Sequence, residues 1–140
     1  MSTQDDLIIR PIKFSELSQL NKLSALEFKS DLQRQFNFFL EHSFFHPIIA
    51  EVDGKIVGCA NVLQNKTSAW LGSAIVLPEY RGQGIGYALV QFRINLLKSK
   101  GCDTFLCMTS KLGGRVVKKF RFLQKSNYIF FNRKKPLDFL

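Results

Sequence analysis

The feature that most restricts the fold of this chain is a turn with three alternating glycines between a predicted strand and a predicted helix. The strand covers 68–77, and Arg81 stands directly before Gly82, Gly84 and Gly86. Glycine lets a backbone approach a ligand closely, and the first turn of a helix leaves N–H groups unpaired beside a partial positive charge. The turn therefore predicts a pyrophosphate-binding site at the start of the helix.

Two other phosphate-binding loops fit this turn poorly. The Rossmann motif needs a third glycine three residues after the second, and that position holds Tyr87 or Leu89, depending on the register. The Gly-Lys-Ser/Thr of a Walker loop does not occur in the sequence. The pattern thus disfavours NAD and ATP as ligands.

Hydrophobic spacing predicts the elements on either side of the turn. Apolar residues at every third position predict a helix over 15–26, and Asp31 is a suitable N-cap for a second helix that ends before Pro47. Asp53-Gly54 between two β-rich runs predicts a hairpin, because glycine readily adopts the positive φ that such a turn needs. After the glycines, Ile85, Leu89, Phe92 and Leu96 mark the apolar face of a helix from Gly84 to Lys100.

The order of these elements predicts a fold class. The expected strands are 7–10, 48–52, 55–63, 68–77, 104–108 and 128–132, and a last helix is expected over 114–120. An antiparallel meander followed by strand–helix–strand predicts an α/β (α+β) fold, with a mixed, mainly antiparallel central sheet flanked by helices. Since no linker or repeat divides the chain, we expect a single domain over 1–140.

The net charge of +9 is unevenly distributed. Residues 1–99 hold 10 basic and 9 acidic residues, whereas 100–140 hold 10 basic residues against Asp103 and Asp138. This asymmetry indicates an anionic partner or a solvated basic face. Phenylalanines alternate with the C-terminal basic residues, as in nucleic-acid stacking platforms, but no helix-turn-helix, zinc-finger or RNP pattern occurs. Nucleic acid is therefore a disfavoured partner.

Other classes of protein are excluded by composition and spacing. No apolar run approaches the roughly 20 residues that cross a bilayer, and the first residues are polar and acidic, unlike a signal peptide. The three cysteines show neither disulfide-scaffold nor zinc-ribbon spacing, and His42 and His46 have no evident third ligand. We expect a cytoplasmic protein with neither a metal nor a membrane partner.

The segment Val76-Leu-Pro-Glu-Tyr-Arg-Gly-Gln-Gly-Ile-Gly86 resembles the acetyl-CoA site of the GNAT N-acetyltransferase family. That family's motif is Arg/Gln-x-x-Gly-x-Gly/Ala, preceded by Val-x-Pro-x-x-Arg, and the resemblance extends over roughly residues 7–133. It implies an enzyme that transfers an acetyl group from acetyl-CoA, its cosubstrate, to a primary amine of a small molecule, peptide or protein. The amine would attack the thioester directly, without a covalent enzyme intermediate.

The resemblance also implies which residues bind acetyl-CoA. Backbone N–H groups from Gln83 to Tyr87 would hold the pyrophosphate, Arg81 would help to position the phosphates, and Val76 would pair with the pantetheine arm where two strands splay apart. The complete implied set is Val76, Arg81, Gly82, Gln83, Gly84, Ile85, Gly86 and Tyr87. Lys111, Arg115 and Lys118 of the following helix are expected near the same phosphates.

The sequence departs from the family in the residues that would move protons. The tyrosine that often protonates the leaving thiolate is replaced by Val117 in one register and by Leu123 in another. The strand over 68–77 carries no carboxylate that could act as a general base. The catalytic residues are therefore unknown, and the candidates are Glu41, His46, Glu51 and Tyr128.

Two interpretations of these departures stay open. In the first, the enzyme uses water or another residue as its acid, since a thiolate is a tolerable leaving group. In the second, the chain is a weakly active or inactive acetyl-CoA-binding module with a regulatory role. A homodimer, in which a second copy completes the C-terminal strand, is a further possibility, and the acceptor has no sequence signature.

Overall fold

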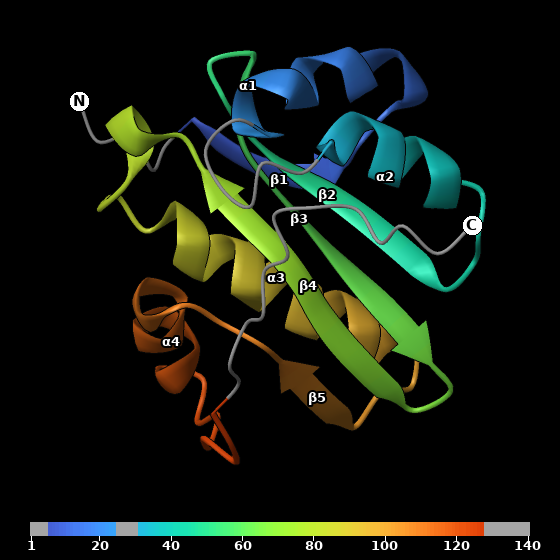
Figure 1. The fold of residues 1–140 in the computed structure, drawn as a ribbon, viewed down its shortest axis with the longest axis vertical. Helices are drawn as coiled ribbons and strands as arrows, with labels where there is room; N and C mark the ends of the chain where they lie inside the picture. The colour runs from blue at the N-terminus through green and yellow to red at the C-terminus, as the bar shows by residue number, and fades with distance from the viewer. Residues whose placement is uncertain (1–5, 25–30, 128–140) are drawn as a thin grey trace, which may run out of the picture.

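A single five-stranded sheet organises the protein, as the computed structural model shows for the described residues 6–24 and 31–127 (Figure 1). The strands are β1 (Leu7–Pro11), β2 (Phe45–Val52), β3 (Lys55–Asn65), β4 (Ser68–Val76) and β5 (Thr104–Cys107). They lie in the order β1-β2-β3-β4-β5, and only the β4–β5 pair is parallel. The predicted mixed, mainly antiparallel sheet is thus confirmed.

Both faces of the sheet are covered by helices. These are the 3₁₀ helices η1 (Phe14–Leu20) and η2 (Pro78–Tyr80), and the α-helices α1 (Asn21–Ser24), α2 (Leu32–Phe39), α3 (Ile85–Ser99) and α4 (Lys111–Lys118). From Ile56 to Val62, β3 is buried at every position rather than alternately, which is the pattern of a strand covered on two faces. In Figure 1, α3 runs behind the sheet, whereas α1 and α2 lie on its other side.

The first predicted helix is mostly a 3₁₀ helix, which is wound more tightly than an α-helix. Leu17 and Leu20 are buried in η1, and Leu23 is buried in the short α1 that follows. A 3₁₀ helix has three residues per turn, so an apolar residue at every third position forms one straight edge. The three-residue spacing therefore predicted the helix and its buried edge correctly, and the 3₁₀ form is the one that suits this spacing. The last leucine of that series, Leu26, lies outside the described residues.

The hairpin and the N-cap are confirmed. Asp53 and Gly54 have φ values of 49° and 76°, the pair of positive values that a type I′ hairpin turn requires. The Asp31 carboxylate accepts a hydrogen bond from the N–H of Arg34 at 3.0 Å, which caps α2.

Two elements, α4 and β2, begin three residues earlier than predicted. α4 begins at Lys111 rather than at residue 114, because the Ser110 hydroxyl accepts the N–H of Gly113 and caps the helix before both of its glycines. β2 begins at Phe45 rather than at residue 48, and Pro47 lies inside it, where its carbonyl accepts the N–H of Ile12 at 3.3 Å. The strand expected over 128–132 lies outside the described residues.

Candidate functional site

The sheet splits between β4 and β5. The two strands pair only from Ser68 with Thr104 to Leu71 with Cys107, although β4 continues to Val76. The N–H of Leu77 donates to the carbonyl of Val57 in β3. Because backbone groups alternate in direction along a strand, the N–H of Val76 faces away from β3, toward the side that β5 has left. The end of β4 therefore offers an open edge with which an extended ligand can pair.

The glycine turn lies directly beyond this edge. Arg81 Nε donates to the carbonyl of Val76 at 2.9 Å and so fixes the turn to the end of β4. Gly82 and Gly84 have φ values of 74° and 84°, in the left-handed region that favours glycine. Gly84 is the N-cap of α3 and supplies no side chain to pair the first N–H groups of the helix. These N–H groups and the helix dipole form a cradle suited to an anion, and the binding of a pyrophosphate there stays a prediction.

One polar atom beside the cradle lacks a partner. Gln83 Oε1 is buried and accepts no hydrogen bond from any of the described residues, although Nε2 of the same amide donates to the carbonyl of Glu79 at 3.4 Å. A buried acceptor without a donor costs free energy, so a ligand N–H at this position would be favoured. The turn thus combines donors for an anion with an acceptor for an N–H group.

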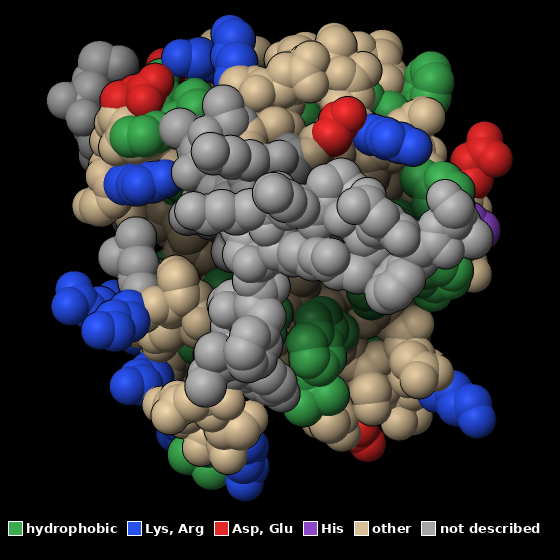
Figure 2. Space-filling model, viewed as in Figure 1, with side chains coloured by type: hydrophobic (Ala, Val, Ile, Leu, Met, Phe, Trp, Pro, Cys, Tyr) green, Lys and Arg blue, Asp and Glu red, His purple; other side chains and the backbone are tan. Residues whose placement is uncertain are grey.

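α4 packs against the first turn of α3. The rings of Tyr87 and Phe120, which follows α4, are 4.5 Å apart between centroids. Lys111, Arg115 and Lys118 are exposed on α4 at a helical spacing that places them on one face. Figure 2 shows Lys and Arg side chains gathered on the side of the molecule where Figure 1 places α4. The predicted closeness of this helix to the glycine turn is confirmed, and the contact of its cations with phosphates stays a prediction.

Arg93 was not among the residues expected to be buried. Its side chain projects from α3 and is only 2% exposed. Nη1 donates to the carbonyls of Asn61 at 3.0 Å and Gly72 at 3.1 Å, and Nε donates to the carbonyl of Leu89 at 3.2 Å. Burial lowers the pKa of this guanidinium to about 10, so it remains charged at neutral pH.

Arg93 meets the sheet at a β-bulge. The register between β3 and β4 shifts between Ala60 and Val62, so that Asn61 and Gly72 leave the regular pairing. The Asn61 side chain fills the space beside Gly72, where an added Cβ would overlap its Oδ1 atom. Gly72 is also the first residue of β4 beyond the last pair with β5. The guanidinium of Arg93, the β-bulge and the end of the β4–β5 pairing therefore meet at Gly72.

Of the candidate proton-transfer residues, Glu41 follows α2, and His46 lies on β2, two strands from β4 in the sheet. Glu41 is exposed after α2. His46, on β2, forms a hydrogen bond at 3.1 Å between Nε2 and Gln64 Oε1, and burial lowers its pKa, with nearby Lys100 acting in the same direction. Gln64 in turn approaches the Lys100 carbonyl, which lies at the opposite end of α3 from the glycine turn.

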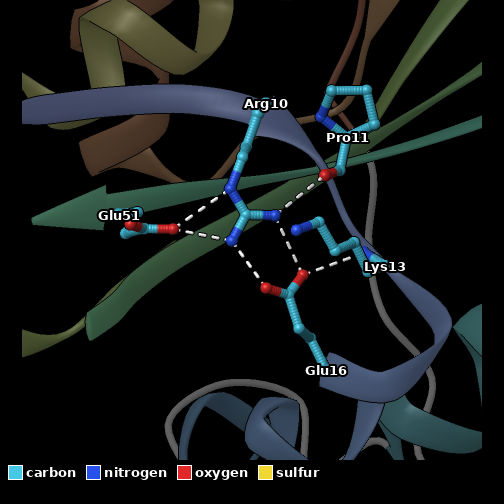
Figure 3. Close-up of polar contacts among 5 residues, drawn as sticks. All are labelled: Arg10, Pro11, Lys13, Glu16 and Glu51. Carbon is cyan, nitrogen blue, oxygen red and sulfur yellow. Dashed lines mark hydrogen bonds and ion pairs between the residues drawn. The ribbon is translucent and has the colours of Figure 1, made fainter. Parts of the chain in front are cut away.

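Glu51, on β2, forms an ion-pair cluster with Arg10 of β1 and Glu16 of η1 (Figure 3). Its Oε2 accepts from Arg10 Nε at 3.0 Å and Nη2 at 2.6 Å, and the same guanidinium binds both carboxylate oxygens of Glu16. β3 separates its strand from β4. Tyr128 lies outside the described residues.

The two positions expected for the missing tyrosine differ in their surroundings. Val117 is buried in the core on α4, and Leu123 is exposed beyond that helix. Neither side chain carries a proton to donate.

Within 6–24 and 31–127, no cluster of three His, Cys, Asp or Glu side chains suits a metal ion, and no helix is long and apolar enough to cross a bilayer.

Comparisons with known proteins agree with this geometry. Residues 14–113 match the Acetyltransferase (GNAT) family. The thialysine N-epsilon-acetyltransferase of Mus musculus is 29% identical over 129 residues, which is 83% of this chain and 75% of that protein. The enzyme of the same name from Sus scrofa is 32% identical over 111 residues, which is 70% of this chain and 64% of that protein.

The fold is shared with solved acetyltransferase structures. Aminoglycoside N-acetyltransferase AAC(6')-Iy in complex with CoA superimposes with a TM-score of 0.76 at 20% identity, over 92% of this chain and 95% of that chain. At such an identity the similarity concerns the fold alone.

Proposed function

The chain belongs to the GNAT family of acetyltransferases, which transfer the acetyl group of acetyl-CoA to amines, and we propose that it acts by direct attack of a primary amine on the thioester. The observation that supports this proposal is the open edge of β4, which leads from the strand split to the glycine turn. The alternative, an inactive acetyl-CoA-binding module, is not favoured, because the curated relatives are named as N-acetyltransferases.

In the proposed complex, acetyl-CoA lies along this edge. The pyrophosphate binds the N–H groups at the start of α3, and Lys111, Arg115 and Lys118 of α4 supply positive charge. The pantetheine arm, which carries amide groups, pairs with β4 from Val76 toward Gly72. These four residue steps span about 13 Å at the strand rise of roughly 3.3 Å. Because β5 closes on β4 at Leu71, the thioester end of the arm stops near Gly72.

The chain contributes to the reaction mainly by position and charge. The neutral amine nitrogen attacks the thioester carbonyl carbon, a C–N bond forms, and the C–S bond breaks with its electron pair going to sulfur. Since His46 and Glu51 lie on β2, two strands from β4, and are hydrogen-bonded to other side chains, we assign water as the acceptor of the amine proton. The thiolate then leaves without a protein acid, in agreement with Val117 and Leu123 at the expected tyrosine positions.

We propose a lysine-like ε-amine as the first acceptor to examine. The two curated relatives are named for thialysine, whose reacting group is a primary amine at the end of a flexible chain. The acceptor is otherwise a primary amine of a small molecule or peptide. We further propose a cytoplasmic location and no requirement for a metal ion, so that a chelator would leave the rate unchanged.

The experiment follows the release of free thiol from acetyl-CoA in the presence of thialysine, lysine and a panel of other amines. The wild type is expected to release thiol with at least one acceptor. A double variant, Arg81→Ala with Gly84→Glu, serves as control, because it removes the contact to Val76 and places a carboxylate in the anion cradle. Calorimetry with acetyl-CoA should show binding to the wild type only. Binding without thiol release from any amine would contradict the proposed activity.

A further inference from the structure

Arg93 is a buried cation without a carboxylate partner among residues 6–24 and 31–127. The ion pairs of this part of the chain all belong to Arg10, and the partners of Arg93 are three backbone carbonyls. A buried charge is costly unless it is paired. Carbonyl dipoles satisfy three of the five N–H donors of the guanidinium but supply no negative charge. The positive charge of Arg93 is therefore not neutralised from within the described core.

The titratable groups that face Arg93 do not neutralise it either. In the part of the chain that the structure describes, they are the thiols of Cys59, which is buried, and Cys107, which is half-buried at the last β4–β5 pair. Burial raises the pKa of Cys59 to about 12 and also raises the pKa of Cys107, so both are neutral thiols near pH 7. Arg93 thus keeps its full charge beside the split.

The position of this charge matters for the reaction. Arg93 Nη1 lies 3.1 Å from the carbonyl of Gly72, the first residue of β4 beyond the split. On the proposed function, the pantetheine arm ends at this residue, so the sulfur atom of CoA comes close to the guanidinium. A cation in a poorly hydrated site stabilises a nearby anion far more than it would in water.

We propose that Arg93 is a positioning residue for acetyl transfer: its buried charge stabilises the departing CoA thiolate and so replaces the proton donor that the chain lacks at Val117 and Leu123. Arg93 touches the backbone of the split rather than the reacting atoms. Its hydrogen bonds to the carbonyls of Asn61 and Gly72 hold the bulge in place, and from there its charge acts on the sulfur atom. The inference rests on the proposed binding of acetyl-CoA but requires no knowledge of the acceptor.

The direct test titrates the thiol of bound CoA. Ultraviolet absorbance of the thiolate is followed against pH for CoA in complex with the wild type and with Arg93→Gln, which keeps hydrogen-bonding capacity but loses the charge. An opposite charge a few ångströms away lowers a pKa by about 1 to 3 units. The thiol bound to Arg93→Gln should therefore titrate at least about one unit higher than the thiol bound to the wild type. Equal values in the two complexes would overturn the proposal.

Two further variants separate charge from structure. Arg93→Lys retains the cation and should restore most of the thiol acidity, even if its hydrogen bonds are fewer. Arg10→Gln is the matched control, because β1, which carries Arg10, is three strands away from β4. It should leave the titration of the bound thiol unchanged. If Arg93→Gln does not fold, the comparison of Arg93→Lys with the wild type still decides: a rise of a full unit in Arg93→Lys would contradict a role for the charge.

Kinetics provide the second measurement once an acceptor is found. Arg93→Gln should lower kcat about tenfold, the equivalent of one pKa unit, with less than about a twofold change in KM for acetyl-CoA. An unchanged kcat in an active enzyme would refute the role of Arg93 and leave the proposed function intact. Failure of the wild type with every amine would instead refute the proposed function, while the thiol titration would still report on Arg93.

Discussion

Two arginines, Arg10 and Arg93, each connect separate parts of the fold, but they differ in exposure and in the charge of their partners. All five N–H donors of Arg10 are used, by Glu16, Glu51 and the Pro11 carbonyl, and its side chain keeps 24% exposure. Arg93 is 2% exposed, and its partners among the described residues are all carbonyls. Hydrogen bonds to Glu16 and Glu51 raise the pKa of Arg10, whereas burial lowers that of Arg93.

This difference indicates that Arg10 has a structural role, whereas Arg93 has a different one. Arg10 lies at the surface with compensating charges, so its loss is expected to change little beyond local packing. Arg93 fills a position between Leu89 and Leu97 on the buried face of α3, where an apolar side chain would ordinarily stand. A charge kept in such a position at the split of the sheet supports the proposed role of Arg93 in acetyl transfer.

The largest change in stability is expected at the bulge itself. Gly72→Ala would drive a Cβ into the buried amide of Asn61 and displace either the amide or the strand. Such overpacking costs about 3 kcal/mol of unfolding free energy, measured by urea denaturation. Asn61→Ala combined with Gly72→Ala removes the obstruction and should recover part of the loss. Additive losses in this double-mutant cycle would show that the two side chains do not compete for the space.

A somewhat smaller loss is expected for Arg93→Met. The carbonyls of Asn61 and Gly72 lose their donor, which costs about 1 to 3 kcal/mol each, while relief of the buried charge offsets part of this penalty. The net destabilisation is about 2 kcal/mol, measured in the same denaturation experiment. An increase in stability would mean that the desolvation of the cation outweighs its hydrogen bonds, which would make the case for a functional charge stronger.

Arg10→Met should cost about 1 kcal/mol or less, because partly exposed ion pairs contribute little and are screened by salt. The measurement is the urea midpoint at low and high salt, and the difference from wild type should shrink as salt rises. A loss larger than that of Arg93→Met would reverse the contrast between the two arginines.

The pH dependence of the Arg10 cluster is the smallest expected effect. Hydrogen bonding to Arg10 lowers the pKa of Glu16 from 4.5 to about 2. A carboxyl with a lowered folded-state pKa contributes stability that is complete above about pH 4.5 and is lost as the pH falls toward 2. Glu16→Gln should flatten this part of the stability profile by less than about 1 kcal/mol. A Glu16→Gln profile as steep as that of the wild type would assign the acid sensitivity to another group.

The glycine turn and the split of the sheet differ in how well they could be predicted from the sequence. The glycine turn was visible because its requirements are local: positive φ at Gly82 and Gly84 and a helix that starts immediately afterwards. The hairpin at Asp53-Gly54 was predictable for the same reason. These local signals, with the order of the predicted strands and helices, were enough to predict the fold class, and the acetyl-CoA site that they indicate stays a prediction.

The split and its arginine depend instead on pairings between residues distant in sequence. The bulge joins Asn61 to Gly72 across two strands, and Arg93 reaches both from a helix that follows them. Helical periodicity placed Ile85, Leu89, Phe92 and Leu96 on the core face, but a charged residue between them is ordinarily assigned to solvent. A useful signal was present, since Arg93 stands four residues after Leu89 and four before Leu97.

The contact between the rings of Tyr87 and Phe120 has a thermodynamic consequence. Tyr87 belongs to the first turn of α3, whose N–H groups form the anion cradle, and its ring contacts the segment that ends α4. Any free energy that an anion gains by ordering this turn is therefore shared with the docking of α4, and the coupling is reciprocal. An anion bound at the turn should slow hydrogen exchange in α4. In return, Phe120→Ala, which loosens the docking of α4, should lower the affinity for the anion.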